Sequence, residues 1–180
     1  MESIVIPETF ELGEIQLRRP RISDLNAIYE YASDLSVAKY MDWPVETSLD
    51  ALEQRLRKRR SLWDSAEEYY WAIAAKENDY VIGGISLRVG TTSAEIGYLL
   101  NKLYWNHGYI TKAARTILDW AFSTSTLYRI WATCDTGNIA SIRVLEKIGM
   151  QKEGLLRKYL IRPNLSEIPR DAYLYARVRE

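Results

Sequence analysis

The chain has 180 residues, of which 47% are hydrophobic, and its 24 basic residues balance its 24 acidic residues. This length and composition suit a single globular domain over residues 1–180. A net charge of zero provides no overall field that would attract a polyanion, so the composition does not favour a nucleic-acid partner.

The sequence has few of the residues that build disulfides and metal centres. Cys134 is its one cysteine and His107 its one histidine, which excludes an internal disulfide and is too few for a metal-ligand cluster. Residues 1–10 lack a basic region followed by a long apolar run, and no stretch approaches the roughly 20 apolar residues of a membrane span. We therefore expect a cytoplasmic protein with no membrane partner.

The N-terminal third predicts one strand and two helices. Residues Ile15–Arg18 are typical of a short strand, and Ser23-Asp24 is a suitable N-cap for the helix that follows. A longer, polar helix begins at Thr47–Asp50. Its basic run, Arg55–Arg60, is more readily interpreted as a solvated helix face than as a phosphate-binding patch.

The middle of the chain predicts three antiparallel strands, at Tyr69–Ala75, Tyr80–Val89 and Ala94–Leu100. Gly83-Gly84 lies inside the second strand and indicates a bulge or a close approach of another part of the chain.

The C-terminal half alternates between helices and strands. The expected order is helix, strand, helix, strand, strand, over residues 108–122, Arg129–Cys134, Asn138–Gly149, Gln151–Ile161 and Ala172–Val178. The whole pattern predicts an α+β domain, with a central mixed, mostly antiparallel sheet of about seven strands and about four flanking helices.

The first helix of this half predicts an anion site at its start. Its apolar residues recur at helical spacing from Ile110 to Phe122, so the helix begins near Gly108. The backbone N–H groups of a first turn have no helical partners, and such a terminus attracts anions. A pyrophosphate cradle is one interpretation, and a β–α junction that binds nothing is the other.

Several segments resemble motifs of the GCN5-related N-acetyltransferase (GNAT) superfamily, in particular of its RimJ/RimL-type branch. The segments are Val37–Pro44, Ala94–Tyr98, Trp105–Ile110, Asn138–Ser141 and Val144–Met150. The order of elements agrees over nearly the whole chain. Two positions depart from the superfamily's phosphate motif, because Ile110 stands where a small residue is usual and His107 where a basic residue is common.

The resemblance implies a GNAT-like fold and an enzyme that moves an acetyl group from acetyl-CoA to a primary amine, by direct attack in a ternary complex. The acceptor would be a protein N-terminus, as in ribosomal-protein acetyltransferases, or a small-molecule amine. A homodimer is also implied, since similar proteins commonly form dimers. The two departures, with Leu145 at a position where many members have tyrosine, leave two alternatives: a non-catalytic acyl-CoA-binding or regulatory module, and an α/β domain that binds no CoA.

By the same resemblance, acetyl-CoA would lie along the strand that ends at Leu100 and over the start of the next helix. Its pantetheine arm would pair with strand backbone, and its pyrophosphate would meet the helix start. The residues expected to bind the cofactor are Tyr98, Leu99, Leu100, Trp105, Asn106, His107, Gly108, Tyr109, Ile110, Thr111, Lys112, Asn138 and Ser141. Asn138 and Ser141 share one helix face, and simple capping is the alternative for this pair.

Glu95 and Ser141 are the expected catalytic residues. Glu95 matches the general base of histone-acetylating members, but a glutamate in an apolar strand is equally well a cross-strand partner. Ser141 is expected to approach the sulfur, because leucine at position 145 cannot protonate the leaving thiolate. Three tyrosines are less favoured as that donor: Tyr98, Tyr109 and Tyr159.

Tyr40 and Trp43 are expected to contact the acceptor together with Glu95, since they lie in the segment that resembles the border of the acceptor site. An α-amine has a pKa of about 7.7–8.0, whereas deprotonating a lysine amine at pH 7 costs about 4–5 kcal/mol. An N-terminal α-amine therefore needs little free energy to lose its proton, and a water molecule that passes this proton to Glu95 would suffice.

Overall fold

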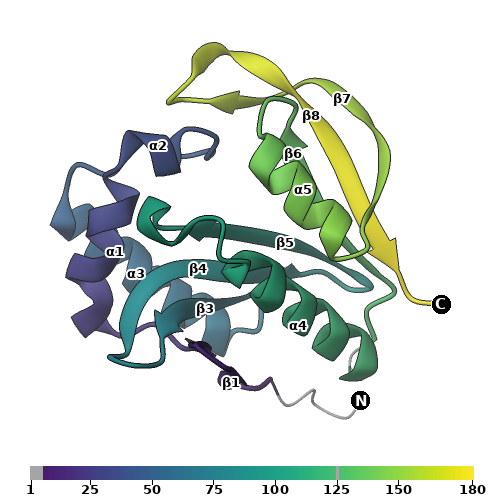
Figure 1. The fold of residues 1–180 in the computed structure, drawn as a ribbon. Coiled ribbons are helices and arrows are strands. Elements are labelled where there is room, and N and C mark those ends of the chain that lie inside the picture. The colour runs from purple at the N-terminus through teal and green to yellow at the C-terminus, as the bar shows by residue number, and fades with distance from the viewer. Residues whose placement is uncertain (1–5, 125) are drawn as a thin grey trace.

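The computed structural model describes residues 6–124 and 126–180, which form a mixed sheet of eight strands with helices on both faces (Figure 1). The order across the sheet is β1-β2-β3-β4-β5-β6-β8-β7. The strands are β1 (Thr9–Leu12), β2 (Ile15–Arg18), β3 (Glu68–Ala75), β4 (Tyr80–Val89), β5 (Ser93–Leu100), β6 (Arg129–Asp135), β7 (Gln151–Arg162) and β8 (Ser166–Val178). The helices are α1 (Leu25–Ala32), α2 (Leu35–Ala38), α3 (Leu49–Asp64), α4 (Tyr109–Thr124) and α5 (Ile139–Lys147).

Helix α4 packs on one face of the sheet through small and branched side chains. The buried residues of the helix itself are Ala113, Ala114, Ile117, Leu118 and Ala121. Alanines allow the helix to lie close to the strands, and burying Ile117 and Leu118 contributes about 1.5–3 kcal/mol each. The amphipathic helix predicted from the spacing is confirmed.

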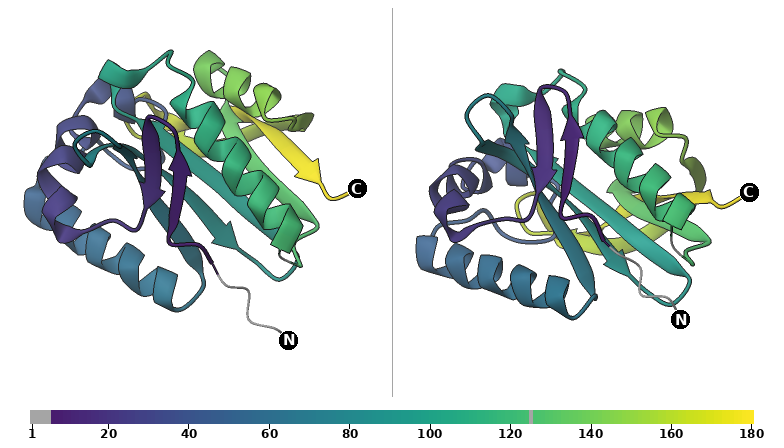
Figure 2. Two further views of the ribbon diagram at one scale, coloured as in Figure 1. Left: turned by 60° about the horizontal axis from the view of Figure 1, so that its bottom comes forward. Right: turned by 90° about the horizontal axis from the view of Figure 1, so that it is seen from below.

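Helices α1 and α3 cover the opposite face of the N-terminal strands. In β3, Trp71 and Ile73 pack in the α4 layer, whereas Ala72 and Ala74 pack with α1 and α3. This alternation follows the two-residue period of a strand. Figure 2 shows the β1–β2 hairpin beside α4, where the ring of Phe10 meets that of Trp120 at 6.2 Å between centroids.

The parallel strands β5 and β6 separate soon after they begin to pair. Their register joins Ser93 to Arg129, Ala94 to Ile130 and Glu95 to Trp131. Beyond these pairs, β5 stays with β4 as far as Leu100, while β6 stays with β8 as far as Asp135. The two halves of the sheet therefore diverge from this point (Figure 1).

The tip of the β7–β8 hairpin holds the segment between α2 and α3. The side-chain amide of Asn164 donates to the carbonyl oxygens of Ala38 (2.7 Å) and Trp43 (2.9 Å). Its Oδ1 accepts from the Val45 N–H at 2.8 Å. Segments about 120 residues apart in the chain are thereby joined.

The sheet differs from the prediction at both of its ends. A short strand, β1, pairs with β2 across the turn at Gly13 (φ +76°), so the described residues contain eight strands rather than about seven, and the short α2 is an additional helix. Strand β8 begins at Ser166 instead of near Ala172, with Pro169 inside it. At Pro169, β8 has passed the end of β6, and proline is tolerated on such an edge.

Two predictions about local structure, the bulge at Gly83-Gly84 and the cap at Asp24, have different outcomes. The register shift at Ile73/Ala74 confirms the bulge, and a Cβ on Gly83 would collide with the Leu99 carbonyl. Asp24 is the N-cap of α1 by position, but its carboxylate does not bond the helix. It accepts from the Arg21 N–H instead and pairs with Arg18 at 2.8 Å, so the predicted side-chain cap is wrong.

Within residues 6–124 and 126–180, none of the helices has the length and hydrophobicity needed to cross a bilayer.

Candidate active site

The start of α4 presents backbone donors as the sequence predicted. Asn106 (φ +64°) and Gly108 (φ +77°) both adopt left-handed conformations and turn the chain into the helix. The first helical hydrogen bond runs from the Lys112 N–H to the Gly108 carbonyl at 3.0 Å, so the amides of residues 109–111 precede the helical ladder. A Cβ on Gly108 would have no atom within 4 Å, so the conformation, not a lack of space, favours glycine there.

Side chains around this bend hold it against β5. The indole N–H of Trp105 donates to the Leu100 carbonyl at 2.8 Å. His107 Nδ1 lies 2.8 Å from the Trp105 carbonyl oxygen, and its ring stacks on Tyr109 with 5.5 Å between centroids. Ile110, one of the two departures from the family motif, packs into the hydrophobic core. Its side chain therefore points away from the donors.

Charged groups lie at the margin of the bend. Lys112 is exposed, and its Nζ is 3.1 Å from the place that a Cβ on Gly13 would take, beside the β1–β2 turn. The Tyr109 hydroxyl donates to Glu14 at 3.2 Å. The bend thus has one lysine and one glutamate at its edge, and its polar character comes mainly from backbone.

The edge of β5 offers further backbone groups. The Asn101 N–H donates to the Ile82 carbonyl at 2.8 Å, which fixes the alternation along this antiparallel pair. By that alternation, Leu99 turns its backbone groups to β4, and Tyr98 and Leu100 turn theirs to the opening beside β6. Of the three predicted pantetheine partners, Leu99 therefore has its backbone directed away.

Tyr98 and Ser141 meet on the α5 side of the sheet. The Tyr98 hydroxyl lies 3.0 Å from Ser141 Oγ and 3.3 Å from the Ser141 carbonyl oxygen. Burial raises the pKa of Tyr98, and the Ser141 bond only partly opposes this, so the phenol is protonated at neutral pH. Asn138 Oδ1 accepts from the Ser141 N–H at 3.2 Å, which confirms the capping interpretation for that atom. Leu145 is buried.

Glu95 lies in a row of side chains that crosses the sheet. Its Oε2 accepts from Arg88 Nη1 at 3.0 Å, and Arg88 also reaches Glu68 at 3.9 Å. Glu95 is therefore the cross-strand partner that one interpretation predicted. Burial raises the pKa of Glu95, Arg88 opposes this, and the negative charges of Asp42 and Glu68 add to the increase. A carboxylate with a raised pKa is also suited to accept a proton, so the two interpretations are compatible.

The two predicted catalytic residues lie on opposite faces of β5. Glu95 and Tyr98 are three positions apart in one strand, so their side chains alternate, and Ser141 contacts Tyr98. The β5–β6 pairing ends at Glu95 and Trp131. A ligand must pass between these strands to contact both groups.

The predicted acceptor residues occupy the Glu95 face. The Tyr40 hydroxyl donates to the Gly137 carbonyl at 2.9 Å, which joins this segment to the β6–α5 turn. Arg55 lies 5.3 Å from the Trp43 ring centroid, and Asn164 holds the Trp43 carbonyl.

Sequence reasoning missed an ionic cluster at the end of β6. Asp135 is 1% exposed and accepts from Arg170 in a two-pronged contact of 2.7 and 3.0 Å. It also accepts from the Gly137 N–H at 2.9 Å. Burial alone would raise the pKa of Asp135, but these bonds hold it below its usual range. Its position directly before the turn and cap at residues 136–138 was the available sequence signal.

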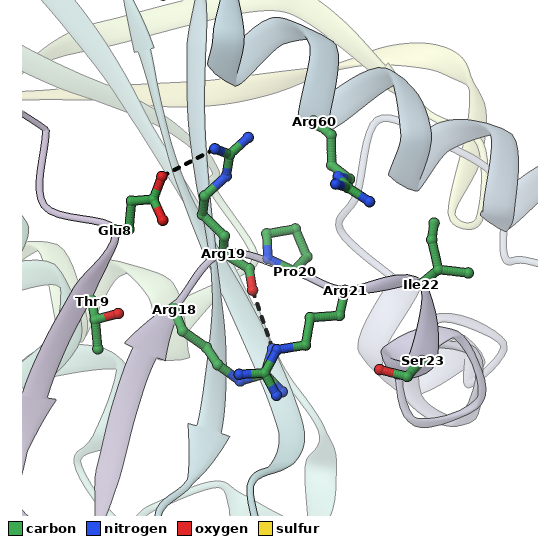
Figure 3. A pocket seen from close by; sticks show the side chains of 9 residues that line it. All are labelled: Glu8, Thr9, Arg18, Arg19, Pro20, Arg21, Ile22, Ser23 and Arg60. Atoms are coloured by element: carbon green, nitrogen blue, oxygen red, sulfur yellow. Dashed lines mark hydrogen bonds and ion pairs between the residues drawn. The ribbon is translucent and has the colours of Figure 1, made fainter.

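A basic cavity of about 480 Å³ lies elsewhere, beside the end of β2 (Figure 3). Three of the four arginines that line it have carboxylate partners: Arg18 pairs with Asp24 and Asp79, Arg19 with Glu8 and Asp64, and Arg21 with Asp79. None of the predicted site residues lines this cavity.

The order of elements, with a helix that starts beside the unpaired end of a strand pair, is the order that the resemblance implied. The Acetyltransferase (GNAT) domain family matches residues 14–151 of the chain. The chain belongs to the GNAT acetyltransferase family.

Relatives of this GNAT acetyltransferase agree in sequence and in fold. The uncharacterised N-acetyltransferase YnaD of Bacillus subtilis is 36% identical over 166 residues, which cover 91% of this chain and 93% of YnaD. A crystal structure of a GNAT-family acetyltransferase from Bacillus anthracis superposes with a TM-score of 0.82 at 30% identity, covering 94% of this chain and 98% of that one. A ribosomal-protein-S5-alanine acetyltransferase from Vibrio fischeri has a TM-score of 0.82 at 25% identity, covering 96% and 97%.

These findings confirm the predicted family with its RimJ/RimL-type likeness, the α+β fold, and an acetyl-CoA-dependent acetyltransferase. They favour the enzyme over both non-catalytic alternatives.

Proposed function

We propose that this GNAT acetyltransferase transfers acetyl from acetyl-CoA to a primary amine, on a protein N-terminus of the ribosomal-protein type or on a small molecule, by direct attack in a ternary complex. The observation that carries the proposal is the loss of pairing between β5 and β6 beyond Glu95 and Trp131, which is what we call the opening. The helix-start donors lie beyond the end of β5, and ionisable groups lie on both sides of this strand, at Glu95 and at the Tyr98–Ser141 pair.

The chain's own groups suit the parts of CoA. The amides of Tyr109, Ile110 and Thr111 would hold the pyrophosphate, since a helix start binds anions through N–H groups and its dipole. The open backbone groups of Tyr98 would pair with the amides of the pantetheine arm, as an edge strand pairs with an extended peptide. Asn138 caps α5 through its Oδ1, and its side-chain NH2 group would donate to this arm.

Glu95 is proposed to remove the proton from the attacking amine, directly or through water. Its raised pKa brings it closer to that of an α-amine, and general bases are most effective when their pKa lies near the working pH. Arg88 keeps the carboxylate oriented.

Ser141 and Tyr98 are proposed to protonate the leaving thiolate. Ser141 Oγ would donate its proton to sulfur, and the Tyr98 phenol, 3.0 Å away, would replace it. This makes Tyr98 more important than the sequence suggested. Acid catalysis by a positioned group typically contributes 10²–10⁴-fold.

The direct test is turnover. The purified protein is incubated with acetyl-CoA and a panel of amines that includes N-terminal peptides, free amino acids and polyamines, and released thiol is measured. We expect saturable thiol release with at least one α-amine. Thiol release that never exceeds the rate without amine, in a protein that still binds CoA by calorimetry, would contradict the proposal. The homodimer remains a prediction that light scattering measures.

A further inference from the structure

Arg162, at the end of β7, is a buried cation without a partner. It is 7% exposed, and its guanidinium makes no hydrogen bond or ion pair with residues 6–124 or 126–180. A guanidinium stays charged at all physiological pH values, and the Arg162 nitrogens are not among the fully buried, unbonded side-chain atoms of the described residues, so this charge stays open to an anion. Arg18, which is 5% exposed, differs from it, because it bonds both Asp24 and Asp79.

Asp135, the carboxylate on which Arg162 acts electrostatically, already has other hydrogen-bond partners. Both oxygens of Asp135 bond Arg170, and one of them also accepts from the Gly137 N–H. Arg162 still lies within electrostatic range, because its charge contributes to lowering the pKa of Asp135 and opposes the rise that burial causes in the pKa of Cys134. The cluster thus contains two guanidinium groups and one buried carboxylate. Its net positive charge would be neutralised by a second anion.

This cluster borders the proposed acceptor site. A Cβ on Gly137 would lie 3.3 Å from the Tyr40 hydroxyl and 3.6 Å from Arg170 Nη2, so the aromatic segment and the cluster meet at this turn. The same turn leads into α5, whose first helical turn carries Ser141. Two residues after Arg162, Asn164 holds the carbonyl of Trp43. Arg162 therefore lies on the hairpin that holds the acceptor segment, within electrostatic range of Asp135 at the end of β6.

The site has opposite charges on its two sides. Glu95, Glu68 and Asp42 interact electrostatically near the start of the opening and would attract an ammonium group. Arg162 and Arg170 lie at the end of β6. A polyamine, which is cationic along its whole length, would satisfy the first side and be repelled by the second.

We infer that Arg162 binds an anionic group of the acceptor, so that the preferred acceptors are amines that carry a carboxylate or a phosphate on the same molecule. The inference rests on the proposed function, since it names the acceptor class of that site. A guanidinium presents a planar fork of donors that fits either anion in a bidentate manner.

Matched peptide pairs test this inference. One pair is a tripeptide and its C-terminal amide, and the other is a phosphoserine tripeptide amide and its serine counterpart; within each pair the attacking α-amine is kept alike. We expect kcat/KM to be about 10–100-fold higher for the anionic member of at least one pair, as one charge-assisted contact allows. The pair that shows the preference identifies carboxylate or phosphate.

Variants then separate recognition from folding. Arg162→Met should reduce the preference to within about twofold of unity and leave the neutral peptide within about threefold of wild type. Arg162→Lys should be intermediate, since it keeps the charge and loses the fork. Arg157→Met, on the exposed side of the same strand, is the control and should keep the preference. A wild-type ratio of one, or an equal loss for both peptides in Arg162→Met, would overturn the inference.

Binding without turnover makes the test independent of folding and of the proposed function. Calorimetry with the wild-type protein compares an N-acetylated tripeptide acid and its N-acetylated phosphoserine amide with the uncharged N-acetylated amide. At least tenfold tighter binding of one anionic ligand is expected, and equal binding of all three would reject the role of Arg162. If no amine is turned over, the proposed function fails, and this comparison still decides the inference.

Discussion

The two ends of the proposed substrate path are built in different ways. At the cofactor end, the donors are backbone amides of one continuous segment, residues 98–112. At the acceptor end, the groups are side chains from segments far apart in the chain, namely Tyr40, Glu95, Asp135 and Arg162. Backbone donors remain whatever the side chains are, so the cofactor end tolerates substitution. The proposed acceptor end depends on each side chain, so we expect it to set specificity.

The largest effect should come from Glu95→Gln, which keeps the shape and removes the proposed base. We expect kcat to fall about 10²–10⁴-fold, while CoA binding measured by calorimetry stays within about twofold. Glu68→Gln is the comparison, since Glu68 also contacts Arg88 but lies two strands from β5; it contributes only a more distant charge, so its kcat should fall far less than that of Glu95→Gln. Equal losses of kcat in the two variants would mean that Glu68, Arg88 and Glu95 act only as a structural ion-pair network.

The second-largest effect tests whether Ser141 and Tyr98 protonate the thiolate while Asn138 binds the cofactor. Ser141→Ala and Tyr98→Phe should each lower kcat about 10–100-fold with the KM for acetyl-CoA kept, because only protonation of the thiolate is lost. Asn138→Ala should instead raise that KM, and it should also cost about 1 kcal/mol of stability through the lost cap.

Asn138→Ser separates the higher KM of Asn138→Ala from its loss of stability, because serine keeps the cap and removes the amide group. It should restore the melting temperature and leave the KM for acetyl-CoA high. A rise in KM after Ser141→Ala as large as that after Asn138→Ala would contradict the division of roles.

A smaller effect is expected in the pH profile of kcat. Burial raises the pKa of Glu95 above 4.5 and Arg88 lowers it in part, so the base is lost by protonation at a higher pH than for an ordinary glutamate. Arg88→Met removes the lowering charge, and the acidic limb should therefore move to higher pH. The same amine is used for both proteins, so that its own titration cancels. A limb that stays in place or moves to lower pH would assign it to another group.

The smallest effect on activity should follow Gly108→Ala. The left-handed backbone at φ +77° would cost about 1–2 kcal/mol, or a few degrees in melting temperature. The added methyl meets no atom within 4 Å, so the KM for acetyl-CoA should change less than about threefold. Gly154→Ala is the control, because it also has free space but no positive φ, and its melting temperature should stay unchanged. A large rise in KM would show that the ligand needs the glycine itself.

Local patterns in the sequence were sufficient for most elements of the fold. The helix after Gly108 was predicted because its buried face recurs at helical spacing, and Gly149 ends α5 at φ +83° as expected. Strand β8 was predicted to begin near Ala172, but it begins at Ser166, and Pro169 lies where the strand has passed its neighbour. Whether a strand is central or at an edge depends on partners far along the chain.

The sequence by itself determined the helix start with its unbonded amides and the α5 cap, because each depends on residues within one or two turns of each other, and its motifs and order of elements carried the family resemblance. Only the tertiary structure placed Glu95 and Ser141 on opposite faces of one strand, joined Tyr98 to Ser141, and left Arg162 buried without a partner. These relations depend on sheet order and on the β7–β8 hairpin reaching the α2 segment. Such contacts form between segments more than 40 residues apart, where spacing in the sequence carries no information about distance in space.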